Sequence, residues 1–123
     1  MNKENLEVAL RFNKYINERN LLELGNLMTE DHSFISSSNT VESGKEHMIE
    51  AWREFFESYP DYRNIFEYTE VHEELVILVG YSTCSEESLD GPAIWTAKIN
   101  DGLVSEWRVY DDTIEVRTKL GIK

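Results

Sequence analysis

The sequence predicts an α+β fold, in which a cone-shaped, curved antiparallel sheet wraps around a long helix. Helical patterns fill the first half of the chain up to Pro60. Four long strand patterns then follow one another between residues 62 and 111, joined by short connections. A chain of 123 residues has the size of one domain, so we expect residues 1–123 to form a single domain.

The composition is acidic. The chain carries 12 Lys and Arg against 24 Asp and Glu, which gives a net charge of −12. This charge would repel a phosphate backbone, so we expect no nucleic-acid partner. We expect no membrane partner either, because no apolar run approaches the ~18 residues that span a bilayer. The single cysteine, Cys84, and an N-terminus without a signal-peptide pattern indicate the cytoplasm.

Three helical patterns precede Pro60. Apolar residues recur with helical spacing over residues 4–19. Asn20 is a suitable N-cap for a short second helix, with Glu23 three residues later. The run Ser43-Gly44-Lys45-Glu46 has the pattern of a capping box and opens the clearest helix, which ends before the proline.

The strand patterns lie between and after these helices. A serine-rich strand is expected over residues 33–38, after a break at residues 29–32, and a brief second strand follows a turn near residue 39. Four longer strands are predicted at residues 62–72, 75–83, 92–100 and 103–111. No element is predicted from residue 113 onward.

The last of these strands follows the turn signal Asp101-Gly102, in which the glycine supplies the positive φ of a tight hairpin. Alternation divides its side chains between two faces. One face carries Leu103, Ser105, Trp107, Val109 and Asp111, and the other carries Val104, Glu106, Arg108 and Tyr110. Neither face is uniformly apolar, which indicates a mixed cavity on one side and solvent or a partner on the other.

Three local patterns resemble a known superfamily when they are taken in order. The first is Leu21-Leu22-Glu23-Leu24 followed by Glu30-Asp31. The second is Ser43-Gly44-Lys45-Glu46 at the start of a helix that continues to Trp52-Arg53-Glu54-Phe55-Phe56. The third is Asp101-Gly102 followed by Glu106-Trp107-Arg108-Val109-Tyr110-Asp111. Over about residues 5 to 112, the chain resembles the SnoaL-like (polyketide cyclase and ketosteroid isomerase-like) branch of the nuclear transport factor 2-like superfamily, whose fold is cystatin-like. The resemblance implies a conical cavity between sheet and helices. It implies no single activity, because this fold hosts isomerases, dehydratases, epoxide hydrolases, cyclases and non-catalytic members.

The catalytic residues of these enzymes do not transfer onto this chain. The resemblance aligns the ketosteroid isomerase base and oxyanion donors with Ser36, Phe12 and a position near Trp95, which supply no carboxylate and no strong donor except an indole N–H. The water-activating aspartate of limonene epoxide hydrolase corresponds to Val109. A dehydratase-like pair of pocket histidines is not expected, because the three histidines lie on separate predicted elements.

These observations favour a small hydrophobic molecule bound in an apolar, aromatic-rich cavity, and they leave open whether the protein is an enzyme with isomerase, cyclase or hydrolase chemistry. The expected ligand-binding residues are Phe12, Phe34, Ser36, Trp52, Phe55, Trp95, Trp107 and Val109. The three tryptophans have an alternative role as plain core side chains. No cofactor and no metal site is predicted.

Two residues are weak catalytic candidates. Asp111, at the cavity mouth, is the best carboxylate for a general base; its alternative role is a structural bond to a backbone amide or a cap at the end of the sheet. His32 beside Asp31 is the second candidate, although neighbouring strand residues point to opposite faces.

The second interpretation is a non-catalytic interaction or dimerisation domain that uses the outer sheet face. There, Glu106 and Arg108 would pair across a two-fold axis beside Tyr110. The two interpretations are compatible, because proteins that resemble this chain are commonly dimers. A homodimer is therefore expected.

Overall fold

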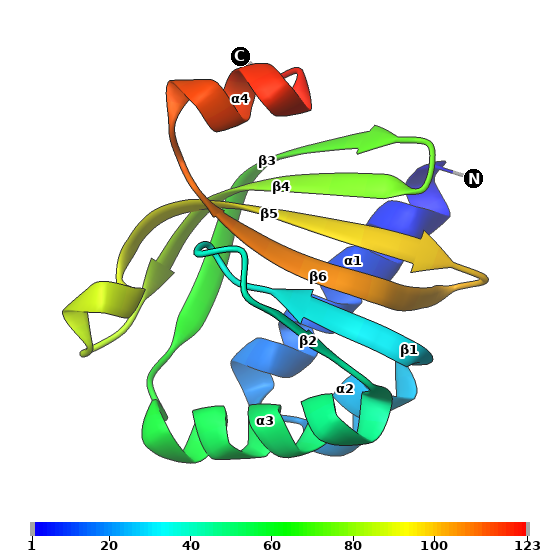
Figure 1. Cartoon of the computed structure of the whole chain (residues 1–123), viewed down its shortest axis with the longest axis vertical. Helices are drawn as coiled ribbons and strands as arrows, with labels where there is room; N and C mark the ends of the chain where they lie inside the picture. Colours follow the sequence, from blue (N-terminus) through cyan, green and yellow to red (C-terminus); the bar gives the residue numbers. More distant parts are fainter. Residues whose placement is uncertain (1, 123) are drawn as a thin grey trace.

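Six strands form one curved sheet in the computed structural model, which describes residues 2–122. The elements are α1 (Asn2–Glu18), α2 (Leu21–Asn26), β1 (Met28–Ile35), β2 (Val41–Ser43), α3 (Lys45–Ser58), β3 (Arg63–His72), β4 (Leu75–Thr83), the 3-10 helix η1 (Glu87–Leu89), β5 (Gly91–Asn100), β6 (Leu103–Asp111) and α4 (Ile114–Leu120). The strand order is β2-β1-β6-β5-β4-β3. Helices α1 and α3 lie on one side of the sheet and α4 lies on the other (Figure 1).

The predicted α+β fold is confirmed, with one exception in strand direction. Strands β3 to β6 form the expected antiparallel meander, but β1 pairs with β6 in parallel. The backbone N–H of Val104 donates to the carbonyl of Leu27 at 2.7 Å, and Met28 is the register partner of Val104. This pairing with β6 explains why β1 begins at Met28 and not at residue 33. The strand therefore includes residues 29–32, where the sequence indicates a break.

Helix α1 crosses the inner face of the sheet. The side chains that it buries share one helical face and are Val8, Ala9, Phe12 and Ile16. Two asparagines of the helix form hydrogen bonds with β3. The Oδ1 of Asn17 accepts a bond from the backbone N–H of Asn64 at 2.9 Å, and the Oδ1 of Asn13 accepts one from Asn64 Nδ2 at 3.0 Å.

The two following helices begin differently. The Asn20 side chain caps α2 as predicted, accepting a bond from the Glu23 N–H at 3.2 Å. The capping box predicted at Ser43 does not form. Ser43 is the last residue of β2, and Gly44, at φ 104°, is the N-cap of α3 without a side-chain cap bond. The Gly44 N–H instead donates to the carbonyl of His32 at 2.8 Å, which ties the start of α3 to the sheet.

A β-bulge interrupts the alternation of β6. Lys98 pairs with Glu106 and the next residue of β5, Ile99, pairs with Val104, so Ser105 is the extra residue. Val104 is therefore fully buried in the inner core beside Trp107, and the prediction that it faces outward is wrong. Beyond the bulge the predicted facing holds up to Asp111.

The C-terminal segment forms a helix that the sequence analysis did not predict. Thr113 caps α4 by accepting a bond from the Val116 N–H at 3.1 Å, and Gly121 ends it in the left-handed conformation. Asp112 binds Arg117 through two bonds of 2.6 and 2.8 Å. This ion pair holds the first turn of the helix against the end of β6.

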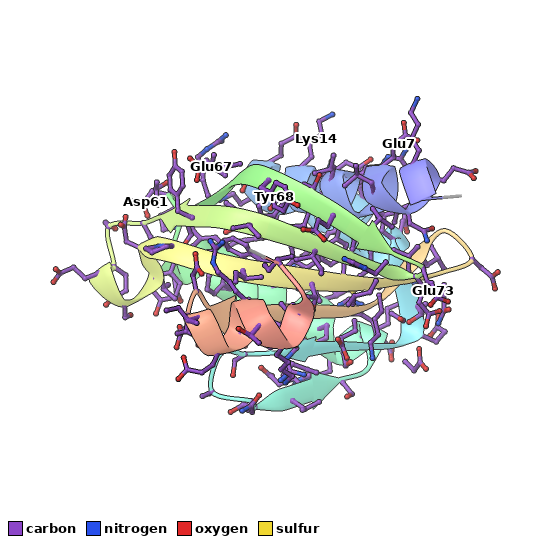
Figure 2. The ribbon with its side chains drawn as sticks, turned by 90° about the horizontal axis from the view of Figure 1, so that it is seen from above. Glu7, Lys14, Asp61, Glu67, Tyr68 and Glu73 are labelled. Carbon is purple, nitrogen blue, oxygen red and sulfur yellow. The ribbon has the colours of Figure 1, made fainter. Side chains whose placement is uncertain are left out.

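The C-terminal segment covers part of the outer sheet face. Ile122 packs there against Ile77, Val79 and Ile94. Figure 2, seen from above, shows α4 lying across the sheet, and Tyr68 of β3 belongs to the same face. The residues proposed for a dimer contact also have partners within the chain: Glu106 lies 3.7 Å from Lys98, and Arg108 donates to Asn39 Oδ1 at 2.7 Å and stacks over the Tyr110 ring.

Candidate ligand-binding cavity

A cavity of about 400 Å³ lies between α3 and the inner face of the sheet. This volume is within the usual range of small-molecule sites. Its wall comes from α3, from β1 and β2, from β4, β5 and β6, and from the η1 segment. The aromatic residues that line it are Phe34, Trp52, Phe55, Tyr62, Trp95 and Trp107.

The rings on α3 hold one another in place. Trp52 makes edge-to-face contacts with Phe34 and Phe55, at centroid distances of 6.0 and 5.5 Å. Phe55 in turn meets Tyr62 edge-on at 4.9 Å. Such contacts fix ring orientations as well as burying apolar area. The apolar wall is therefore largely formed before any ligand enters.

Seven of the eight predicted ligand-binding side chains line the cavity, namely Phe34, Ser36, Trp52, Phe55, Trp95, Trp107 and Val109. Phe12 is the exception. It is fully buried and packs against Trp107 at 4.8 Å, outside the cavity lining. Because α1 crosses the sheet behind Trp107, a side chain on this helix contributes to the core and leaves the cavity wall to α3. The binding role of the seven stays a prediction.

His32 also lies away from the cavity. It is fully buried, 5.6 Å from the Phe12 ring, and its Nδ1 lies 2.7 Å from the carbonyl oxygen of Val104. This bond requires a proton on Nδ1 and leaves Nε2 as an acceptor, which has no partner among the described residues. Burial lowers the pKa of His32, so the ring is neutral. Asp31 points outward and accepts a bond from Thr29, so His32 and Asp31 form no acid–base pair, in line with the opposite facing expected of neighbouring strand residues.

Three carboxylates line the cavity. Glu42 receives a bond of 2.8 Å from His47 Nε2, and the Cys84 backbone N–H donates to Asp90 at 3.0 Å. Asp111 is exposed at the end of β6, and its carboxylate has no hydrogen bond or ion pair with the rest of the described chain. The alternative role of Asp111, a structural hydrogen bond to a backbone amide, is therefore absent among the described residues.

The sequence analysis missed several polar residues of the wall, among them Glu42, Asp90, Tyr62 and Ser82. Burial raises the pKa of the Tyr62 hydroxyl to about 12, against the opposite influence of the nearby Asn64 and Ser82 side chains, so it is a neutral hydroxyl at pH 7. The Ser82 hydroxyl donates to the carbonyl of Leu89 at 2.5 Å and ties η1 to β4. Ser82 is a polar residue on the inner side of an otherwise apolar strand, which is a signal that the sequence does contain.

Two indole N–H groups of the wall lack acceptors. The Nε1 atoms of Trp52 and Trp95 are buried and have no hydrogen-bond partner among residues 3–122. Their side chains are 6% and 1% exposed. A buried donor without an acceptor is unfavourable.

No three His, Cys, Asp or Glu side chains of the described chain are grouped so that they could hold a metal ion. Within that part of the chain, every helix is too short or too polar to cross a membrane.

The chain is similar to known proteins in structure and not in sequence. No protein-family model matches the sequence, and no curated protein matches it significantly. A protein of Jannaschia sp. CCS1 named as a SnoaL-like polyketide cyclase is 22% identical, with a TM-score of 0.77, over 95% of this chain and 91% of its own. A protein of Kribbella flavida named as a ketosteroid isomerase is 16% identical, with a TM-score of 0.75, over 91% and 80%.

A third neighbour, an NTF2-like protein of unknown function from Cytophaga hutchinsonii, is 14% identical, with a TM-score of 0.73, over 95% of this chain and 94% of its own. These similarities confirm the predicted resemblance at the level of fold. The chain has the SnoaL-like, NTF2-like fold, with the cystatin-like arrangement of a curved sheet around helices.

Proposed function

We propose that the protein binds a small hydrophobic molecule in the cavity beside α3. The observation that carries this proposal is the aromatic-lined cavity of about 400 Å³, whose wall includes Trp52 and Trp95 with their acceptor-free indole N–H groups. An apolar cavity with a few polar groups is the usual form of a ligand site. The ligand would place an acceptor, such as a carbonyl oxygen, within reach of these donors.

The structural neighbours support the same class of ligand. Two are named as a polyketide cyclase and a ketosteroid isomerase, and both names refer to compounds that carry carbonyl groups on apolar skeletons. Tyr62, neutral at pH 7, adds a hydroxyl donor to the wall. We therefore propose a ring compound with at least one carbonyl oxygen.

The proposed function is binding without a catalytic step. Of the two weak catalytic candidates, Asp111 borders the cavity and His32 lies in the core. A solvated carboxylate alone is a poor base for a carbon-bound proton. Binding is the function that these groups support best.

The test is a thermal-unfolding screen with neutral bicyclic ketones, 1-tetralone first, on three proteins. Val109→Trp fills the cavity from its wall, and Val41→Trp adds the same ring on β2, outside the lining. We expect the ketone to raise the Tm of the wild type and of Val41→Trp, but not of Val109→Trp. No Tm increase with any compound, or an equal increase in Val109→Trp, would overturn the proposal.

We also propose the homodimer and the cytoplasmic location expected from the sequence. The outer face beyond α4 presents Tyr68 and Tyr81, which are 52% and 36% exposed, and this area could bury against a second copy. A single cysteine suits a reducing compartment. Light scattering would give twice 14.4 kDa for the dimer, and a mass of 14.4 kDa at micromolar protein would exclude it.

A further inference from the structure

We propose that the ligand carries a second oxygen atom, which accepts a hydrogen bond from the Tyr62 hydroxyl at the end of the cavity away from the two indole N–H groups. The inference rests on the proposed function and adds a second polar group to the proposed ring ketone. Tyr62 and Ser82 both line the cavity, and both are buried. Together they form a buried polar patch in the wall.

The polar groups around Tyr62 come from the paired ends of β3 and β4. Asn64 and Ser82 are register partners on these two strands, and both are buried. Their side chains lie near the Tyr62 hydroxyl. The inner side of the sheet is therefore polar at this end, next to the cavity.

The Tyr62 side chain is held in place. Its ring meets the ring of Phe55 edge-on at 4.9 Å, and its backbone N–H donates to the carbonyl of Tyr59 at 3.2 Å. Asn64 beside it is fixed by α1, because its Nδ2 donates to Asn13 Oδ1 at 3.0 Å. A donor that is positioned in advance loses little conformational freedom when a ligand binds.

The Tyr62 hydroxyl keeps a proton that it can donate. Burial raises the pKa of this group to about 12, so it is neutral at pH 7. The neighbouring Asn64 and Ser82 side chains lower the pKa, whereas a group that accepted the Tyr62 proton would raise it. The proton is therefore available to an acceptor in the cavity.

The polar patch lies apart from Trp95 along the sheet. Trp95 on β5 is the register partner of Leu78 on β4. Leu78 and Ser82 are four residues apart on the same strand, which corresponds to about 13 Å of backbone.

The patch also lies apart from Trp52 along α3. Trp52 precedes the end of the helix at Ser58 by six residues, or about 9 Å along the helix axis. Tyr62 follows that end. A single carbonyl oxygen beside the indoles would therefore leave the Tyr62 hydroxyl without an acceptor, and a second oxygen on the ligand would supply one.

The test compares 1-tetralone with three derivatives of the same skeleton, 5-hydroxy-, 6-hydroxy- and 7-hydroxy-1-tetralone. Each compound is titrated calorimetrically into the wild type, Tyr62→Phe and Tyr59→Phe. Tyr59→Phe is a matched control, because the Tyr59 ring also contacts Phe55, at 5.0 Å, but lies outside the cavity lining.

We expect at least one hydroxytetralone to bind the wild type and Tyr59→Phe about three- to tenfold more tightly than 1-tetralone, which is the usual gain from one net hydrogen bond. This gain should vanish in Tyr62→Phe, and 1-tetralone itself should bind Tyr62→Phe as it binds the wild type.

A gain with none of the three isomers, a gain that survives Tyr62→Phe, or a gain that both substitutions remove equally would overturn the inference and leave the proposed function intact. A loss of 1-tetralone itself from Tyr62→Phe would overturn it as well, because Tyr62 would then bind the first carbonyl. If none of the four compounds binds the wild type, the proposed function fails and the inference fails with it.

Discussion

The ring of Phe12 lies 4.8 Å from the ring of Trp107, and Trp107 separates the core on α1 from the cavity on its other side. Trp107 therefore has two tasks, as a core side chain that is 1% exposed and as part of the cavity wall. The contact explains why a loss of binding after truncation of Trp107 would not by itself identify a ligand contact.

The first prediction concerns this double role. Trp107→Ala should lower the free energy of unfolding by about 3–5 kcal/mol, because it removes a fully buried ring and leaves a void against Phe12. Chemical denaturation followed by far-UV circular dichroism measures the loss. Trp107→Phe, which keeps an aromatic ring there, should retain most of the stability. A loss under about 1 kcal/mol in Trp107→Ala would contradict this packing.

Gly80 gives a second prediction. It faces the bulge at Glu67 on β3, and a Cβ on it would lie 1.9 Å from the backbone oxygen of Ile65. Gly80→Ala should therefore lower the free energy of unfolding by about 1–3 kcal/mol, because backbone and not a flexible side chain would have to move. The denaturation midpoint measures this. An unchanged midpoint would mean that β3 and β4 do not approach in this way.

The third prediction uses the C-terminal segment. Ile122 is 6% exposed against the outer sheet face, whereas Ile114 on α4 is 82% exposed. Ile122→Ala should lower the free energy of unfolding by about 2 kcal/mol, and Ile114→Ala should change it by less than about 0.5 kcal/mol. Equal effects of the two substitutions would mean that α4 does not dock on Ile77, Val79 and Ile94.

His32 provides the fourth prediction, a dependence of stability on pH. Its pKa is lowered in the folded protein by burial, so the unfolded chain binds the proton more readily. The free energy of unfolding should fall as the pH drops through 6.5, the ordinary pKa of histidine, with a slope of at most about 1.4 kcal/mol per pH unit. The fall should level off below the folded-state pKa.

The controls for this prediction are two asparagine substitutions. His32→Asn keeps a donor toward the Val104 carbonyl and removes the titrating ring, so the change in stability between pH 6.5 and 5 should shrink. His47 is exposed on the surface beside Glu42, and the change in stability between pH 6.5 and 5 should shrink less in His47→Asn than in His32→Asn. A profile that His32→Asn does not alter would contradict the assignment.

Periodicity predicted most of the fold, because long amphipathic elements carry a repeated signal. The helices on either side of Asn20, the helix that ends before Pro60 and the four-strand meander follow from it directly. The extra residue Ser105 could not be predicted, because a bulge reverses the facing of Val104 without changing the residue pattern around it. The start of β1 depends on pairing with β6, a partner distant in sequence.

The C-terminal helix was predictable from its ends. Thr113 and Gly121 are suitable cap residues around a seven-residue helix. The helix itself has few apolar residues, and the sheet face on which the segment packs cannot be located from the sequence alone. Alternation along β6 also predicted the cavity wall at Trp107, Val109 and Asp111. Phe12 was misplaced because resemblance assigned it to the cavity, while packing puts it behind Trp107.

The most direct test of the central claim follows the indole N–H signals of the three tryptophans by ¹H–¹⁵N NMR, each assigned with its Trp→Phe variant. With saturating 1-tetralone, the signals of Trp52 and Trp95 should move downfield as their buried Nε1–H groups gain an acceptor, and Val109→Trp should abolish both movements. Indole signals that stay in place at saturating ketone, or that move equally in Val109→Trp, would contradict the account.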